Sequence, residues 1–555
     1  MPVAPIFAGM LPALHRRAPR TRLFPALLLG VAAALAPVRA AAQLLPVGDV
    51  WEDYLRVLDA VGGASLGSNF VRPLAIRRVL AGVPDTLPHP WRRTLAPPSA
   101  QRLFGGAELV LADPGLRSFL NTSRPYGANE GAVWVGRGVT AAVDAGATLR
   151  WGRTTLTVHP TLAFAQNRAF ELAPVTRPGG NRYAYPWRSI DLPQRFGPTA
   201  IWTLDPGQSS ARTALGPVTV GVGTESLWWG PGLRNAILMS NNAPGFAHAL
   251  LESSRPLSVG IGTVEGQWIW GRLSRSRWFD TTSADPGRFV TGAVLAFSPK
   301  WLAGLHLGVG RLFYGRIPEG GVPWSEALVV FQGVRKETLA AVANPGGEDR
   351  RDQMFSSFAR WVLPASGVEL WGEWARADHG WNFRDYYLEP EHSSGYTIGL
   401  RKVAGVGGNR LLVLESELTS LGRSTTSRVR DVPTFYAHHL VYEGYTQRGR
   451  VIGAAVGPGG NAQYAGVKMY APWGRAGVFA ERRVLDNDAY YAQAEPGEWC
   501  CHAAFLDVGA EGLTTVRDLE ISASGTISRE FNRYFRSHSD HWNLGLRLES
   551  RWRGR

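Results

Sequence analysis

The sequence predicts an all-β protein: a transmembrane antiparallel β-barrel, preceded by a small helical region at its N-terminus. Three observations predict it. Segments of about ten residues alternate apolar and polar side chains, short turns alternate with long polar segments, and the final segment alternates aromatic or aliphatic residues with polar ones. Composition agrees, because 65 of 555 residues are glycine, 11% are aromatic and only 19% are charged. The chain is too aromatic for a coiled coil, and beyond its N-terminus no run of about 18 apolar residues predicts a membrane helix.

The first element is an export signal over residues 1–42. A basic stretch ending at Arg22 precedes the apolar run 23–37, and three alanines offer a cleavage site before Gln43. A retained membrane anchor is the alternative. Cleavage removes five Arg and no acidic residue from 59 basic and 45 acidic residues, which leaves a net charge of +9. The positive charge is scattered, so we expect no nucleic-acid partner, although it suits an anionic glycan or a lipid headgroup.

Residues 43–100 are expected to form a periplasmic helical region and a linker. Apolar side chains from Trp51 to Val61 recur at helical spacing, Asp49 can cap the helix, and Gly62 and Gly63 can end it. A second short helix is expected over residues 74–80, followed by a Pro-rich linker over residues 84–100.

Residues 101–555 are expected to form the barrel. In the segment 155–164, Leu156, Val158, Leu162 and Phe164 share one face, and threonines and His159 share the other. A soluble β-sandwich or a propeller would also alternate, but the chain has no blade repeat of about 40 residues. The same alternation recurs in segments 368–374 and 412–419, and in the final strand through Trp542, Leu544, Leu546, Leu548 and Trp552.

The lengths of the connections favour a membrane barrel. At about 23–25 residues for a strand with its connection, the chain provides 16 to 18 strands. The final strand is similar to those by which barrel-assembly machinery recognises its clients, so this machinery and outer-membrane lipids are expected partners. Tight turns are predicted at 298–300, 364–367, 405–409 and 472–475, and long loops at 315–354, 376–394, 421–434 and 485–504.

Motifs for catalysis or metal binding are weak. Ser65 lies in a G-x-S-x-G match, but it follows a predicted helix, whereas a nucleophile elbow follows a strand. His438 and His439 would point to opposite faces of a strand, so a structural role is expected and no metal site. The adjacent Cys500 and Cys501 are either loop thiols or a vicinal pair. We therefore expect no enzyme and no cofactor.

Charged residues on the polar faces of the strands predict a lattice inside the barrel. Glu369 and Glu373 share a face about 13 Å apart, which exceeds the usual spacing of glycosidase carboxylates. We expect them to pair with arginines such as Arg401. Such rows also set selectivity in pores, so a porin or substrate-specific outer-membrane channel is the alternative function.

One predicted loop combines aromatic and acidic side chains. Trp381, Tyr386 and Tyr387 lie in the segment 376–394 together with Asp378 and Glu389. Flat aromatic faces beside polar groups can stack on sugar rings, so these residues are candidate polysaccharide contacts. Packing within the loop is the alternative.

A tryptophan motif and an asparagine pair stand out in the middle of the chain. Residues 225–232 read Glu-Ser-Leu-Trp-Trp-Gly-Pro-Gly, and residues 238–243 read Leu-Met-Ser-Asn-Asn-Ala. They are accompanied by the segments 369–374, 390–396, 436–439, 444–449 and 457–459. In this combination the mature chain resembles the Wzi family of capsule assembly proteins.

The resemblance implies an outer-membrane barrel of about 18 strands with a small N-terminal periplasmic helical bundle. It also implies binding of capsular or another surface polysaccharide, without catalysis. It makes the motif residues candidate polysaccharide contacts, whereas the same side chains could instead shape a turn and satisfy backbone groups. An outer-membrane enzyme is the third and weakest hypothesis. The motif candidates are Trp228, Trp229, Arg234, Asn241 and Asn242.

Overall fold

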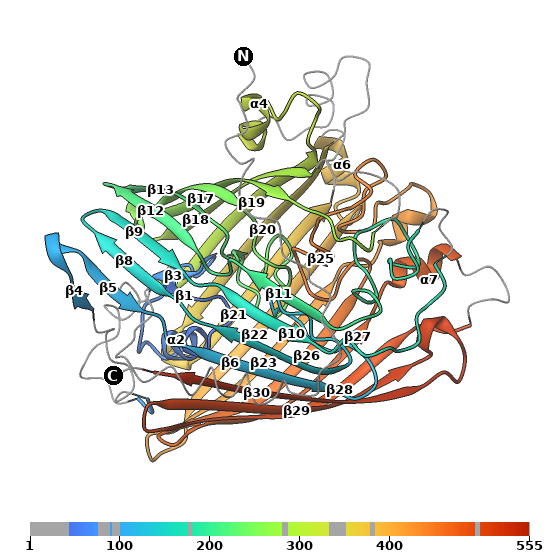
Figure 1. Ribbon diagram of the computed structural model, residues 1–555. Coiled ribbons are helices and arrows are strands. Elements are labelled where there is room, and N and C mark those ends of the chain that lie inside the picture. Colours follow the sequence, from blue (N-terminus) through green and yellow to red (C-terminus); the bar gives the residue numbers. More distant parts are fainter. Residues whose placement is uncertain are drawn as a thin grey trace.

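The computed structural model describes residues 44–75, 89–91, 100–175, 180–279, 287–331, 351–377, 383–493 and 500–553. Over these ranges the chain is mostly one antiparallel sheet of 24 strands, with few and short helices (Figure 1). The all-β prediction is confirmed. No helix in the described part combines the length and the apolar character needed to cross a membrane. The predicted export signal lies outside the described residues.

The N-terminal region contains helix α2 (Val50–Ala60), where the sequence predicts it. The carboxylate of Asp49 caps it by accepting a hydrogen bond from the backbone N–H of Trp51, 2.8 Å away. The described residues do not support a helical bundle, because α2 is the one helix that they contain before residue 100. Leu74 and Ala75 pair as strand β3 with β1 (Leu44–Leu45), and the rest of the predicted second helix lies outside the described residues.

The first part of the large sheet is built from short strands. These are β4 (Gln101–Arg102), β5 (Glu108–Leu111), β6 (Gly115–Asn121), β7 (Gly138–Asp144), β8 (Ala147–Trp151), β9 (Thr154–Val158), β10 (Thr161–Ala165), β11 (Ile201–Asp205), β12 (Ser210–Leu215), β13 (Val218–Gly223), β15 (His248–Ser253) and β16 (Leu257–Ser258). Three small pairs lie outside the sheet: β1 with β3, β2 (Val71–Arg72) with β14 (Trp228–Trp229), and β24 (Thr446–Gln447) with β25 (Arg450–Val451).

The second part consists of long strands that pair with their neighbours along the chain. They are β17 (Gly262–Leu273), β18 (Arg288–Pro299), β19 (Leu305–Arg316), β20 (Arg351–Leu363), β21 (Val368–Ala377), β22 (Ser394–Gly405), β23 (Leu411–Ser420), β26 (Asn461–Ala471), β27 (Gly474–Val484), β28 (Ala504–Val516), β29 (Leu519–Phe531) and β30 (His541–Trp552). The last strand, β30, pairs antiparallel with β6, where Leu546 lies opposite Leu120.

The strands expose their apolar face and bury their polar face. On β23, 46% of Leu414 is exposed, whereas only 5% of the adjacent Glu415 is exposed. The predicted faces are confirmed in β9 and β10, where Leu156, Val158 and Leu162 are exposed. They are also confirmed in the final strand by the exposed side chains of Trp542, Leu544, Leu546 and Leu548. This arrangement is the reverse of a soluble protein, in which charged side chains are rarely buried.

The connections follow the predicted asymmetry. Short turns join β18 to β19, β20 to β21, β22 to β23 and β26 to β27, at the predicted positions. The long connections at the other end carry the short helices α4 (Trp324–Ala327), α6 (Phe383–Leu388) and α7 (Asn487–Gln493) (Figure 1). The 3₁₀ turns are η1 (Phe104–Gly106), η2 (Val329–Phe331), η3 (Pro364–Ser366), η4 (Thr425–Arg428) and η5 (Arg533–Phe535).

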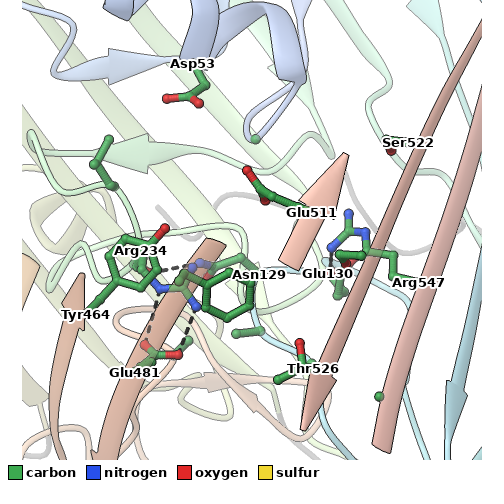
Figure 2. A pocket seen from close by; sticks show the side chains of 18 of the residues that line it. Asp53, Asn129, Glu130, Arg234, Tyr464, Glu481, Glu511, Ser522, Thr526 and Arg547 are labelled. Atoms are coloured by element: carbon green, nitrogen blue, oxygen red, sulfur yellow. Dashed lines mark hydrogen bonds and ion pairs between the residues drawn. The ribbon is translucent and has the colours of Figure 1, made fainter. Parts of the chain in front are cut away.

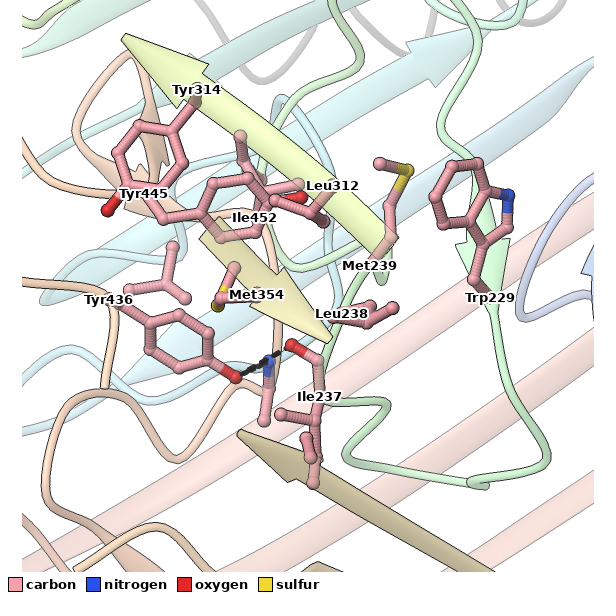
Figure 3. Packing of buried hydrophobic residues seen from close by; sticks show 14 of the residues in the cluster. Trp229, Ile237, Leu238, Met239, Leu312, Tyr314, Met354, Tyr436, Tyr445 and Ile452 are labelled. Carbon is pink, nitrogen blue, oxygen red and sulfur yellow. Dashed lines mark hydrogen bonds between the residues drawn. The ribbon is translucent and has the colours of Figure 1, made fainter. Parts of the chain in front are cut away.

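Two clusters fill the space beside the polar face of the sheet. At the short-turn end, α2 packs on Val403, Val413, Tyr470 and Leu513. At the long-loop end, the connections between β13 and β15 and between β23 and β26 form the larger core, shown in Figure 3. Its labelled members include Trp229, Ile237, Leu238, Met239, Tyr436, Tyr445 and Ile452.

Candidate functional site

The tryptophan motif lies inside the fold. Trp228 is buried, and the guanidinium of Arg72 lies 4.4 Å from the centre of its ring. Trp229 is fully buried in the large core, and its indole N–H donates to Oε1 of Gln267 on β17 at 2.8 Å. Both tryptophans also form strand β14, which pairs with β2. The motif therefore joins the N-terminal region to the sheet.

The asparagine pair fastens the same connection to two other segments. The Nδ2 of Asn241 donates to the carbonyl of Val47 at 3.1 Å, and the Nδ2 of Asn242 donates to the carbonyl of Val451 at 2.9 Å. Both bonds satisfy backbone carbonyl groups, as the architectural alternative expects. Each of the side chains of Trp228, Trp229, Asn241 and Asn242 therefore has a partner within the protein.

Arg234 is the motif candidate that lines a cavity. Its guanidinium lies 4.4 Å from the ring centre of Tyr464, and its Nη2 lies 2.9 Å from Oε2 of Glu481 (Figure 2). Burial alone would lower the pKa of Arg234, but the Glu481 carboxylate raises that pKa above its usual range. The side chain of Asn129 donates to the Arg234 carbonyl at 2.8 Å.

The cavity has a volume of about 380 Å³ and lies between α2 and the polar face of the sheet. Its lining mixes aromatic rings with eight basic and eight acidic side chains, so it has no net charge. Figure 2 shows Asp53, Glu130, Glu511 and Arg547 around it. Rings beside paired charges can bind polar, uncharged molecules, or enclose water.

One wall of the cavity is an ion-pair cluster around Asp53 of α2. The Asp53 carboxylate lies 2.5 Å from Arg401, 3.2 Å from Lys468 and 3.5 Å from Arg475, and it accepts a hydrogen bond from Tyr470. Burial would raise the pKa of Asp53, but Lys468, Arg401 and Arg475 together hold it well below its usual range. The helix is thus bound electrostatically to strands β22, β26 and β27.

Among the described residues, the predicted pairing with arginines is found for Glu369 but not for Glu373. Glu369 contacts Arg56 of α2 and Arg360 of β20, each at 2.6 Å, and lies 3.7 Å from Arg401. Glu373 accepts hydrogen bonds from Ser356 and from the backbone N–H of Ile237. Glu369 therefore binds α2, and Glu373 binds the connection between β13 and β15 that carries the tryptophan motif.

The predicted aromatic loop is described in part. Tyr386 and Tyr387 belong to α6, and 82% of Tyr387 is exposed, whereas Trp381 lies outside the described residues. Nearby in the chain, Glu389 pairs with Arg430 of the β23–β26 connection at 2.9 Å. The long-loop end therefore presents an exposed aromatic ring and, two residues further along the chain, an ion pair.

The sequence reasoning missed other aromatic groups at the same end. Tyr442 is exposed, with Arg316 lying 5.1 Å from its ring centre. Tyr490 and Tyr491 of α7 pack with His502, and Tyr490 also contacts Phe535 of η5. Beside them Cys500 and Cys501 form a disulfide, the vicinal alternative. The contacts of Tyr442 with Arg316 and of Tyr490 with Phe535 join distant parts of the chain, so no single sequence window could predict them.

The expected strand position of the histidine pair is wrong. His438 and His439 lie in an irregular loop, where their ring centres are 4.6 Å apart. The Nδ1 of His438 accepts hydrogen bonds from the backbone N–H groups of Leu440 and Val441, which is a structural role. Among the residues that the structure describes, no group of three or more His, Cys, Asp or Glu side chains is placed to hold a metal ion.

The sequence of residues 123–473 matches the family model of the capsule assembly protein Wzi. The chain belongs to the Wzi family. The match contains the tryptophan motif, the asparagine pair, Glu369, Glu373 and α6. No curated protein sequence matches the chain.

Among solved structures, the chain is similar to the Escherichia coli outer-membrane protein Wzi, a carbohydrate-binding β-barrel involved in group 1 capsule assembly. The two are 16% identical, the match covers 92% of this chain and 99% of that one, and the TM-score is 0.60. This similarity concerns the fold. The match to OccK7 (OpdD) of Pseudomonas aeruginosa has 12% identity, covers 80% of this chain and 98% of that one, and has a TM-score of 0.38.

Proposed function

We propose that this Wzi family member is an outer-membrane β-barrel that binds exported capsular polysaccharide and helps to attach or assemble the capsule at the cell surface. The observation that carries the proposal is the family match over residues 123–473. The reversed burial of the strands supports the membrane location, because hydrocarbon favours an apolar exterior. Outer-membrane lipids and the barrel-assembly machinery are the partners that such a barrel requires.

The proposed barrel has eighteen strands. The pairing of β30 with β6 supports closure, because it joins the two ends of the sheet. Four strands are each interrupted once and are counted as one strand: β5–β6, β7–β8, β9–β10 and β11–β12. Likewise β16 is counted with β15, and the two-residue strand β4 is not counted. Joined in this way, the 24 segments give the eighteen strands. We keep the proposed division into a signal (1–42), a periplasmic region (43–100) and the barrel (101–555).

Polysaccharide contact is assigned to the long-loop end. There the exposed ring of Tyr387 offers a flat face for a sugar, and the Glu389–Arg430 pair, two residues further along the chain, offers polar groups. We assign Trp228, Trp229, Asn241 and Asn242 the architectural role, because their partners are inside the protein. Arg234 faces the cavity and also stays within the fold.

The proposed mechanism is multivalent binding without catalysis. A long polymer contacts many copies of the protein, so weak individual sites suffice to hold the chain at the surface. The test is deletion of the gene in its host, followed by measurement of polysaccharide on cells and in the medium. We expect polysaccharide to move into the medium at unchanged total synthesis, and the wild-type gene to restore attachment.

An unchanged partition would contradict the proposal and favour the channel. A channel predicts open conductance of the purified protein in planar bilayers, which attachment does not require. Conductance together with unchanged partition would therefore replace the attachment function by a porin function.

A further inference from the structure

One long connection folds back over the exposed face of the sheet. The segment of α4 and η2, residues 324–331, follows β19, and η2 packs on β18 and β19. Its buried side chains Val329 and Val330 contact Phe313 of β19 and lie beside Trp268 of β17. We call residues 324–331 the flap.

The strand register places the flap on the outer wall. Trp268 lies opposite Ala293, which lies opposite Arg311, and side chains at paired positions share one face. Leu295 and Val309, a pair on the same face, are exposed. The side chains of the interior, such as Leu312 and Met354, belong to the opposite face.

Beneath the flap the outer wall is polar. Thr291, Arg311 and Gln353 are all buried there, although their positions belong to the apolar exterior. Thr291 donates to the carbonyl of Ala327 at 3.0 Å, and Arg311 donates to the carbonyl of Val330 at 3.2 Å. Arg311 also donates to Oε1 of Gln353 at 2.9 Å. The flap thus supplies acceptors to polar groups that lipid could not satisfy.

The outer side of the flap is apolar. Trp324, Leu328 and Phe331 are 55%, 52% and 66% exposed, and Trp324 also packs on Trp270 of the wall, with 5.2 Å between ring centres. Arg351 of β20 fixes the flap from the side through Glu326 at 3.1 Å. Tryptophan with neighbouring Leu and Phe is the composition of segments that lie in the membrane interface.

We propose that the flap is an in-plane membrane anchor that covers a polar patch of the wall and inserts Trp324, Leu328 and Phe331 into lipid of the outer leaflet. The inference rests on the proposed membrane barrel. Lipid is the occupant because the flap continues the exposed apolar face of the same strands and lies at their long-loop ends (Figure 1).

The test uses spin labels on the full-length protein in phosphatidylethanolamine–phosphatidylglycerol vesicles. Cys500 and Cys501 are first replaced by serine, and single cysteines are then introduced as Leu328→Cys, Phe331→Cys, Leu295→Cys and Tyr387→Cys. Collision with oxygen reports lipid, and collision with a water-soluble nickel complex reports water. We expect labels at 328 and 331 to favour oxygen, like the label at 295, and the label at 387 to favour nickel.

The control positions separate the possible failures. Nickel access at 331 with oxygen access at 295 overturns the flap proposal and leaves the barrel proposal intact. Low access of both reagents at 331 also overturns it, because a second copy or another protein would then cover the flap. Nickel access at 295 contradicts the membrane barrel itself, and the flap proposal fails with it.

Discussion

Arg56 and Glu369 stand 313 positions apart in the chain, yet the Nε of the arginine lies 2.6 Å from a carboxylate oxygen of the glutamate. Both side chains are buried. The contact joins α2 to the sheet strand β21, and the Arg56 guanidinium also lies 4.8 Å from the ring centre of Trp371. This pair, together with the Asp53 cluster, holds the helix inside the fold.

Breaking this buried pair should strongly destabilise the protein. Arg56→Ala leaves the Glu369 charge with fewer partners in a buried place, so we expect a loss of about 3–5 kcal/mol in the free energy of unfolding. Denaturant unfolding of the protein in lipid vesicles measures it. Arg536→Ala is the matched control, because its pair with Glu171 is exposed and should contribute about 0–1 kcal/mol. Equal effects of the two variants would contradict the role of the buried pair.

The attachment of α2 should depend on pH only in acid. The pKa of Asp53 in the folded protein is held well below its value in the unfolded chain, which is about 3.9. The carboxylate therefore stabilises the fold at pH values above this unfolded pKa, and its contribution is lost as the pH falls toward the lowered pKa. The protection of the α2 amides, measured as their exchange rate relative to the intrinsic rate at the same pH, should therefore be constant from neutral pH to about 4 and fall below it. Asp53→Asn should exchange faster at neutral pH and lose the acid transition. An acid transition that persists in Asp53→Asn would assign it to another group.

Trp229 is expected to act through stability. Trp229→Ala removes a fully buried ring and leaves Oε1 of Gln267 without its donor, which costs about 3–5 kcal/mol. Trp229→Phe keeps most of the packing and should cost less. Unfolding of both variants and polysaccharide retention by cells should be measured together. Full stability with lost retention would make Trp229 a ligand contact.

Tyr387 is expected to act through binding. Tyr387→Ala should leave unfolding unchanged, because the ring is exposed, and it should weaken each polysaccharide site by about 1–2 kcal/mol, or roughly 5- to 30-fold. Binding of purified polysaccharide to vesicles that contain the protein measures this. Trp301→Ala serves as the control, since it removes an exposed ring in a turn at the opposite end. Undiminished binding by Tyr387→Ala would remove α6 from the proposed site.

Features that depend on the strand period could be predicted from the sequence. Alternation placed Leu414 outside and Glu415 inside, and it placed Glu369 with Arg401, because side chains of a strand alternate strictly between two faces. The turns and α2 were also found, since their signals lie within a few adjacent residues.

Features that depend on distant contacts could not be predicted. The partner of Trp229 is Gln267, and the partner of Asn242 is the carbonyl of Val451, and neither leaves a local signal in the sequence. His438 and His439 were wrongly placed on a strand because a loop packed into the interior can be as apolar as a strand. The predicted helical bundle is not supported, because Leu74 and Ala75 pair with strand β1, a contact that is distant in the sequence.

The position of Asp49 has a consequence for the order of events during biogenesis. This N-cap of α2 pairs with Arg551 of β30 and with Arg553 just beyond it, so Asp49 can form these ion pairs only once β30 is in place. The helix therefore acquires its complete set of anchors only after the last strand has taken its place. A chain that lacks β30 would lose both of these ion pairs together with the partner strand of β6, so the attachment of the N-terminal helix depends on the same strand that joins the two ends of the sheet.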